Sequence, residues 1–155
     1  MKKIFIIIAA IAAVGVGYWL ISPLFREEVV NERLEDIMPT PPAGGQAQQQ
    51  TQVISSGTFS GLAGHNAEGT AKLLKIGEEF YIRFEDDFKV TNGPDLFVHF
   101  GKDGQYLANA RLGNLKGNIG GQNYKVPAEL NPADFNEVWV WCRSFSVPFG
   151  KAVLN

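Results

Sequence analysis

An uncharged, strongly apolar run extends from Ile4 to Phe25, directly after Lys2 and Lys3. As a helix with a rise of about 1.5 Å per residue, such a run is roughly 33 Å long, which matches a hydrocarbon core of about 30 Å. Because the two lysines precede it, the positive-inside rule places the N-terminus in the cytoplasm. The sequence therefore predicts a transmembrane signal-anchor within residues 1–25. It also predicts a plasma-membrane (cytoplasmic-membrane) location and an extracytoplasmic C-terminal part.

A cleaved signal peptide is the alternative, with Ala10 and Ala12 as the small residues at its cleavage site. The apolar run continues well past Ala12, whereas the core of a cleavable signal is short and ends near the cut, so an uncleaved anchor is favoured. Under either interpretation the rest of the chain is exported.

Small residues recur at every fourth position of the expected membrane helix, at Ala9, Ala13 and Gly17. Residues at this spacing lie on one helix face, where small side chains let a second helix approach closely. A homodimer through this face is one hypothesis. The alternative is that small residues are simply common in membrane helices.

Residues 26–53 separate the apolar run from the remainder of the chain. Residues 26–36 are rich in charge, and a short helix at the membrane interface is expected there. From Pro39 the sequence consists mainly of Pro, Gly, Gln, Ala and Thr, which bury too little apolar surface to offset the entropy lost on ordering. This segment is predicted to be a flexible linker.

Residues 54–155 contain short apolar runs separated by turn residues. A hairpin is expected over residues 72–84 around Gly77, and a strand over residues 95–100 with a tight turn at Asp103-Gly104. Residues 138–142 form the most apolar strand, residues 151–154 a closing strand, and residues 128–135 one short helical turn. Because no segment sustains helical periodicity, we expect an all-β domain, either a small β-sandwich or a barrel-like sheet.

Composition excludes several classes of function. The net charge of −2 and the absence of a basic run in the β domain argue against nucleic acid as a partner. Cys142 is the only cysteine, so neither an internal disulfide nor a cysteine zinc cluster can form. The acidic residues 85–87 lack calcium-loop spacing, and the glycine-rich residues 117–121 lack a phosphate-loop Lys. They are interpreted as a solvated turn and a structural loop.

Cys142 follows Val138 and Val140 at alternate positions of the expected strand, so the three side chains share one face. Trp139, Trp141 and Arg143 point to the other face. A buried, unreactive thiol is one interpretation; a redox thiol, a ligand, or an intermolecular disulfide are the others. A hydrolase that uses this thiol is the least supported.

The two histidines of the domain are His65 and His99. With Cys142 they could in principle form a copper-type site, but neither His nor Met directly follows Cys142. His99 alternates with Val98 and Phe100, so it faces away from the apolar side, and a solvated position is predicted for it.

Several motifs occur together in a fixed order: Gly57-Thr58-Phe59 with His65 and Gly69, Arg83-Phe84-Glu85 with Phe88, Thr91-Asn92-Gly93-Pro94-Asp95-Leu96, Leu115-Lys116-Gly117-Asn118, Gln122-Asn123-Tyr124, Trp141-Cys142, and Phe145-Ser146-Val147-Pro148-Phe149-Gly150 with Ala152. In this order they resemble the DM-thirteen domain, also called the electron-transfer DM-thirteen family. The resemblance covers about residues 54–154.

The resemblance implies a small β domain outside the membrane that takes part in electron transfer or in oxidation of cell-surface proteins. Cys142 matches the family's hallmark cysteine, which is suggested to act as a thiol or to ligate a group such as haem, and His65 matches a recurrent histidine. We therefore expect a redox accessory with Cys142 as its reactive residue, His65 as a further cofactor-binding candidate, and a cell-surface or periplasmic protein as partner. The alternative is a non-catalytic adhesion or assembly module with a structural cysteine.

Overall fold

The computed structural model describes residue 11 and residues 15–17, 27–38 and 51–155. Eight strands form one sheet in the order β7-β6-β9-β10-β1-β3-β4-β8, and all their pairings are antiparallel. The strands are β1 (Thr51–Gly61), β3 (Thr70–Ile76), β4 (Glu79–Phe84), β6 (Leu96–Lys102), β7 (Gln105–Asn114), β8 (Gln122–Lys125), β9 (Glu137–Cys142) and β10 (Val147–Val153). Two short strands, β2 (Ala67–Glu68) and β5 (Lys89–Val90), pair separately.

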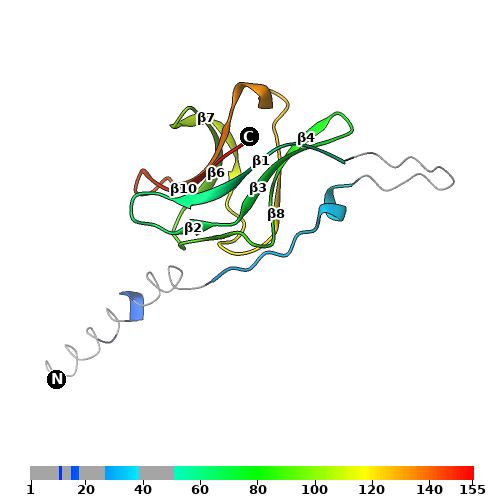
Figure 1. The fold of residues 1–155 in the computed structure, drawn as a ribbon. Coiled ribbons are helices and arrows are strands. Elements are labelled where there is room, and N and C mark those ends of the chain that lie inside the picture. Colours follow the sequence, from blue (N-terminus) through cyan, green and yellow to red (C-terminus); the bar gives the residue numbers. More distant parts are fainter. Residues whose placement is uncertain (1–10, 12–14, 18–26, 39–50) are drawn as a thin grey trace, which may run out of the picture.

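The sheet curls around its own core, so that its two edge strands approach each other (Figure 1). At this closure a Cβ atom on Gly113 of β7 would lie 3.6 Å from the ring of Tyr124 on β8. The backbone N–H of Lys116, just after β7, donates to the Tyr124 hydroxyl at 3.1 Å. The result is an all-β half-barrel, which confirms the predicted fold class.

The predicted hairpins form at turns whose residues favour a positive φ. Strands β3 and β4 join through Gly77, whose φ is +61°, and β6 and β7 join through Asp103 and Gly104, both with positive φ. Two-residue turns of this kind match the right-handed twist of the strands and favour Gly and Asp. A 3-10 helix, η3 (Pro132–Asp134), occupies the predicted helical turn, and the closing strand β10 begins earlier than expected.

The inner face of the half-barrel is filled with apolar side chains from every long strand. Val98 and Phe100 of β6, Val138 and Val140 of β9, and Ile82 of β4 are all fully buried. This alternation is what makes these runs strands, because every second side chain must face the core. The core holds the outer-face residues of β6, β7 and β9 in a fixed register.

Residues 27–38 lie along the domain as an extended segment, which we call the strap (Figure 1). The N–H of Val30 donates to Ile119 at 2.9 Å, and the N–H of Glu32 donates to Gly121 at 3.0 Å. Helical structure in the strap is limited to a 3-10 helix, η2 (Leu34–Ile37). The expected interfacial helix is therefore wrong for residues 27–33, because pairing with the domain holds them extended.

The strap explains the glycine-rich loop at residues 117–121. A Cβ atom would lie 2.4 Å from the Glu28 carbonyl oxygen at Gly117 and 2.2 Å from the Val30 carbonyl oxygen at Gly120. Only glycine permits so close a backbone approach. The loop is structural, as predicted, and it is shaped to receive the strap.

No helix among the described residues is long and apolar enough to cross a membrane. The predicted anchor, residues 4–25, lies outside the described residues except at residues 11 and 15–17. Of the small-residue face, Ala9 and Ala13 are outside them as well. Residues 39–50 of the expected linker are also not described, and β1 begins at Thr51, slightly before the expected start of the domain.

Candidate functional site

Cys142 is the last residue of β9, and its side chain points into the core. It is a free thiol with 0% exposure. Its strand neighbours are Leu96 on β6 and Val147 on β10. The predicted grouping with the buried Val138 and Val140 is confirmed, and a thiol in such surroundings packs as a small apolar side chain.

The thiol is nevertheless close to an exposed turn, because residues 143–146 follow it directly. Arg143 donates to the Asp95 carboxylate at 2.8 Å, and the Ser144 hydroxyl donates to the same carboxylate at 3.1 Å. Ser146 has a φ of +53°, and Phe145 is 66% exposed. A short, partly strained turn held by the half-buried Asp95 carboxylate is a segment that can open locally.

A metal or haem group ligated by Cys142 does not fit this closed core. The sulfur is fully enclosed by the core cluster, so an iron atom could reach it only after the side chains around it moved apart. Within the described part of the chain, no group of three or more His, Cys, Asp or Glu side chains could hold a metal ion. In particular, Cys142 faces the inner side of the sheet, whereas His99 lies on the outer side.

His65 lies just after β1 and is half-buried. Its ring stacks on Phe149 with centroids 3.6 Å apart and an angle of 11° between the planes. Phe149 belongs to the same core cluster as Cys142, so His65 covers the core from outside. The structure therefore places His65 at the rim of the core, stacked on Phe149.

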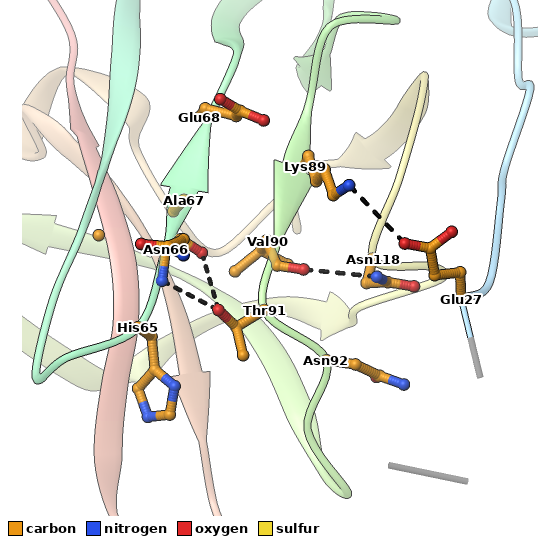
Figure 2. Close-up of a pocket in the computed structure, with 11 residues that line it drawn as sticks. Glu27, His65, Asn66, Ala67, Glu68, Lys89, Val90, Thr91, Asn92 and Asn118 are labelled. Atoms are coloured by element: carbon orange, nitrogen blue, oxygen red, sulfur yellow. Dashed lines mark hydrogen bonds and ion pairs between the residues drawn. The ribbon is translucent and has the colours of Figure 1, made fainter. Parts of the chain in front are cut away.

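A shallow cleft of about 720 Å³ lies beside His65. Its lining is Glu27, Gly61, His65, Asn66, Ala67, Glu68, Lys89, Val90, Thr91, Asn92 and Asn118. Figure 2 shows the Lys89–Glu27 ion pair, 3.7 Å long, at one end of this cleft and the His65 ring at the other. Its mixed polar lining suits a polar surface group rather than an apolar cofactor.

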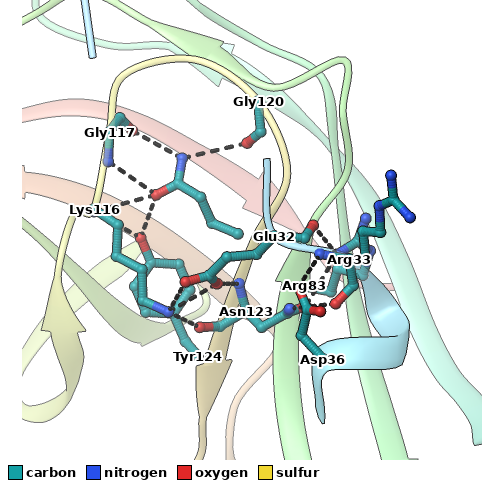
Figure 3. A network of polar contacts seen from close by, with 10 residues as sticks. Glu32, Arg33, Asp36, Arg83, Lys116, Gly117, Gly120, Asn123 and Tyr124 are labelled. Carbon is teal, nitrogen blue, oxygen red and sulfur yellow. Dashed lines mark hydrogen bonds and ion pairs between the residues drawn. The ribbon is translucent and has the colours of Figure 1, made fainter. Parts of the chain in front are cut away.

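A polar network lies beneath the strap (Figure 3). Arg83, only 6% exposed, donates to the Glu32 carbonyl at 3.1 Å and to the Asn123 side chain at 3.0 Å. Lys116 pairs with the Glu32 carboxylate at 2.7 Å. The fully buried Gln122 accepts from the backbone of the glycine loop and donates back to it. Because these polar groups satisfy one another, the network fixes the strap against the domain.

His99 is 4% exposed, so the prediction that it is solvated is wrong. It does face away from Val98 and Phe100, as expected. However, Trp139 of β9 lies opposite it on one side, and Tyr106 of β7 covers it on the other, with ring centroids 4.8 Å apart. The outer face of this part of the sheet is thus covered by aromatic rings.

Tyr106 is the centre of this outer aromatic cluster, which consists of His99, Tyr106, Trp139 and Trp141. The Tyr106 ring stacks on Trp141 with centroids 4.0 Å apart and meets Trp139 edge-on at 6.4 Å. Its hydroxyl is 3.3 Å from Nε2 of His99, whose Nδ1 is 3.3 Å from the carbonyl oxygen of Leu107. Aromatic pairs in these geometries attract each other beyond their burial.

Burial shifts the titration of both polar members of the cluster. Desolvation lowers the pKa of His99 below 6.5, and the positive charge of Arg111 acts in the same direction. The Leu107 carbonyl opposes this shift. Desolvation also raises the pKa of Tyr106 above 10. At neutral pH the cluster therefore contains a neutral imidazole and a neutral phenol in hydrogen-bond distance.

Sequence reasoning missed this cluster because its members come from three strands. The alternation of residues 138–142 placed Trp139 and Trp141 on the outer face, and this is confirmed. Tyr106 follows the predicted Asp103-Gly104 turn, so a hairpin register could have brought it near His99. No signal in the sequence gives the pairing of β6 with β9, which completes the cluster.

Comparison with known proteins gives one family. The model of the family described as Electron transfer DM13 matches residues 58–154, which is more than half of the chain. No curated protein and no solved structure matches the chain. The matched residues span nearly the whole half-barrel, from β1 through β10. The chain belongs to the electron-transfer DM-thirteen family.

Proposed function

We propose that this protein is an extracytoplasmic accessory of electron transfer, held at the plasma membrane by residues 4–25, with Cys142 as its redox residue. The family match over residues 58–154 supports the redox role. The apolar run after Lys2 and Lys3 supports the tether and its orientation. The observation that carries the role of Cys142 is its position: it is sealed in the core but directly precedes an exposed turn.

The chemistry follows from that position. While β9 and β10 are paired to their ends, no disulfide can reach the sulfur. When residues 143–146 and the Cys142–Val147 pair open, the thiolate can attack a disulfide of a protein partner, and the partner's leaving sulfur takes up a proton. As the mixed disulfide forms, the Cys142 sulfur is oxidised from the thiolate to the disulfide level, and the partner's leaving sulfur is reduced to a thiol. Because the chain has one cysteine, a thiol of an external reductant must attack the Cys142 sulfur of the mixed disulfide, which releases the partner as a dithiol, and a second such thiol then restores Cys142.

Labelling kinetics of Cys142 test this proposal. The full chain in detergent micelles is mixed with an aromatic disulfide reagent, and release of the coloured thiol is followed. Asp95→Ala removes the carboxylate that holds the turn, so we expect labelling to accelerate a few-fold, as the loss of a surface ion pair worth up to about 1 kcal/mol implies. Gly77→Ala is the matched control, because it strains the remote β3–β4 turn by roughly 1–2 kcal/mol.

The two variants separate local from global opening. If labelling requires only the turn to open, Asp95→Ala accelerates it and Gly77→Ala does not. If both variants accelerate labelling in proportion to the stability they lose, the thiol reacts only in the unfolded chain. That result would refute Cys142 as a redox residue.

A non-catalytic adhesion or assembly module is the second candidate, and the 0% exposure of Cys142 favours it. In this case the thiol fills the core, and the polar cleft beside His65 offers the binding surface. Cys142→Ala would then leave partner capture and cellular phenotype intact. Alanine is the appropriate replacement, because serine would bury an unpaired hydroxyl at about 1–3 kcal/mol.

A further inference from the structure

The outer aromatic cluster holds a phenol hydroxyl against an imidazole nitrogen. Nδ1 of His99 lies 3.3 Å from the Leu107 carbonyl oxygen, which can only accept, so Nδ1 carries the hydrogen. In a neutral imidazole Nε2 then has a free lone pair, and it is this atom that lies 3.3 Å from the Tyr106 hydroxyl. Tyr106 therefore donates to His99, and the backbone fixes the direction of the hydrogen bond.

We propose that Tyr106 and His99 form a proton-coupled, one-electron redox site on the outer face of the half-barrel, with Trp141 as its contact for the electron. The site differs from Cys142, which lies on the inner face of the sheet. The inference rests on the proposed electron-transfer role of the protein, and it does not need the cysteine.

The proposed step needs only Tyr106, His99 and one external oxidant. A one-electron, outer-sphere oxidant removes an electron from the Tyr106 phenol and is itself reduced by one electron. The O–H bond breaks, and its proton forms a new bond to Nε2 of His99. The products are a neutral tyrosyl radical and an imidazolium, and the return of one electron restores the phenol and the neutral imidazole. A phenol without such a base must lose its proton to water at the same time, which is slower.

The surroundings of His99 keep its imidazole in the form that can accept a proton. Burial lowers the pKa of His99, so the imidazole is neutral and can accept a proton at neutral pH. Arg111, whose charge acts on His99 in the same direction, is stacked over the Phe97 ring at 4.0 Å and does not compete for Nε2. The half-buried Tyr106 is shielded from water on its Trp141 side by a stacked ring 4.0 Å away.

Trp141 connects the pair with the surface. Its ring is partly exposed and lies parallel to Tyr106 at 12°, so an electron needs to cross only one van der Waals contact. Trp139 is less suited to this role, because it is buried. A one-electron carrier would dock over Trp141 and Tyr106.

Flash oxidation tests the site on the full chain in detergent micelles. Photogenerated tris(bipyridine)ruthenium(III) is the oxidant, and the radical is identified by electron paramagnetic resonance after labelling with ring-deuterated tyrosine. We expect a tyrosyl signal in the wild type that Tyr106→Phe removes. Tyr81→Phe is the matched control, because Tyr81 also donates its hydroxyl to a side chain, the Glu79 carboxylate at 2.7 Å. This variant should retain the signal.

The rate of radical formation reports the role of His99. His99→Gln should slow radical formation by roughly a hundredfold, the usual contribution of a positioned base. D₂O should slow radical formation in the wild type, and the size of this isotope effect should differ in the variant. Tyr106→Phe removes only a hydroxyl from a half-buried ring, so it tests the site even if His99→Gln fails to fold. A signal that survives Tyr106→Phe, a tryptophanyl signal in the wild type, or a rate indifferent to both His99 and D₂O would overturn the proposal.

The outcome is distinguishable from that of the Cys142 test. A Tyr106 radical in a protein whose thiol labels only after unfolding would support the Tyr106–His99 site and leave the electron-transfer role without the cysteine. Locally gated labelling of Cys142 without a Tyr106 radical would overturn the Tyr106–His99 site alone.

Discussion

His99 shows how one buried side chain makes the folding stability of the sheet depend on pH. It hydrogen-bonds to the Leu107 carbonyl and to Tyr106, and desolvation lowers its pKa below 6.5. In the unfolded chain the imidazole binds a proton as pH falls through about 6.5. In the folded protein it does so only at lower pH. The unfolded state therefore binds more protons in this window, and folding stability falls as pH falls below 6.5.

We predict that His99→Phe flattens this pH dependence. The variant is less stable at pH 7.5, because the Leu107 carbonyl loses its partner, at about 1–3 kcal/mol. Between pH 6.5 and pH 5 it should lose less stability than the wild type, because it has no imidazole to protonate there. Urea unfolding across this range measures the difference. Parallel curves for the two proteins would show that His99 is not held neutral in the fold.

At the scale of elements, the strap packs closely on the glycine-rich loop because glycine has no side chain there. Gly120 combines a φ of +92° with a Cβ position 2.2 Å from the Val30 carbonyl oxygen. Alanine would therefore meet both a left-handed backbone and a steric clash with the strap. Gly64 offers the matched control, since its φ is +81° and a Cβ atom there would meet nothing within 4 Å.

We predict that Gly64→Ala costs only the left-handed backbone, about 1–2 kcal/mol, whereas Gly120→Ala costs more and detaches the strap. Limited proteolysis within residues 27–38 measures detachment directly. Cleavage there should be faster in Gly120→Ala and unchanged in Gly64→Ala. Equal cleavage in both variants would mean that the close approach of strap and loop does not hold residues 27–38.

Local patterns predicted the elements whose partners are close in sequence. Gly77 and Asp103-Gly104 determine their own turns, and the β-branched and aromatic run at residues 138–142 can bury one face only as a strand. The strap could not be predicted in this way. Its residues are rich in charge, which is typical of a solvated segment. The partners of Glu28 and Glu32 lie about ninety positions away, so no local pattern indicates them. The burial of His99 was missed because its cover on one side, Trp139 of β9, is forty positions away, although Tyr106 follows it in the β6–β7 hairpin.

At the scale of the whole molecule, the strap bears on how the domain would be held by the proposed membrane segment. Glu27, the first residue of the strap, comes almost directly after the proposed membrane segment, and the strap is paired with the domain from Glu28 onward. If residues 4–25 are in the membrane, the half-barrel is held against the membrane surface rather than on a long tether. The outer aromatic cluster would then keep a fixed distance from the bilayer.

We predict that a fragment of residues 51–155 is less stable than one of residues 27–155. Without the strap, Arg83 loses the Glu32 carbonyl, Asn123 loses the Arg33 carbonyl and Lys116 loses its carboxylate partner. Leaving such groups unpaired should reduce the free energy of unfolding by about 2 kcal/mol or more. Thermal and urea unfolding of the two fragments measure this. Equal stability would show that residues 27–38 do not belong to the folded domain.

The central claim is that the domain exchanges electrons on the outer side of the membrane. The most direct test gives a charged aromatic disulfide, a thiol oxidant that does not cross membranes, to sealed vesicles that contain the full chain in a single known orientation, so that Cys142 supplies the electrons. Vesicles with the domain outward should reduce the oxidant in proportion to the amount of protein, and inverted vesicles should not. Reduction no greater than that by vesicles without the protein, or reduction only by inverted vesicles, would contradict the claim.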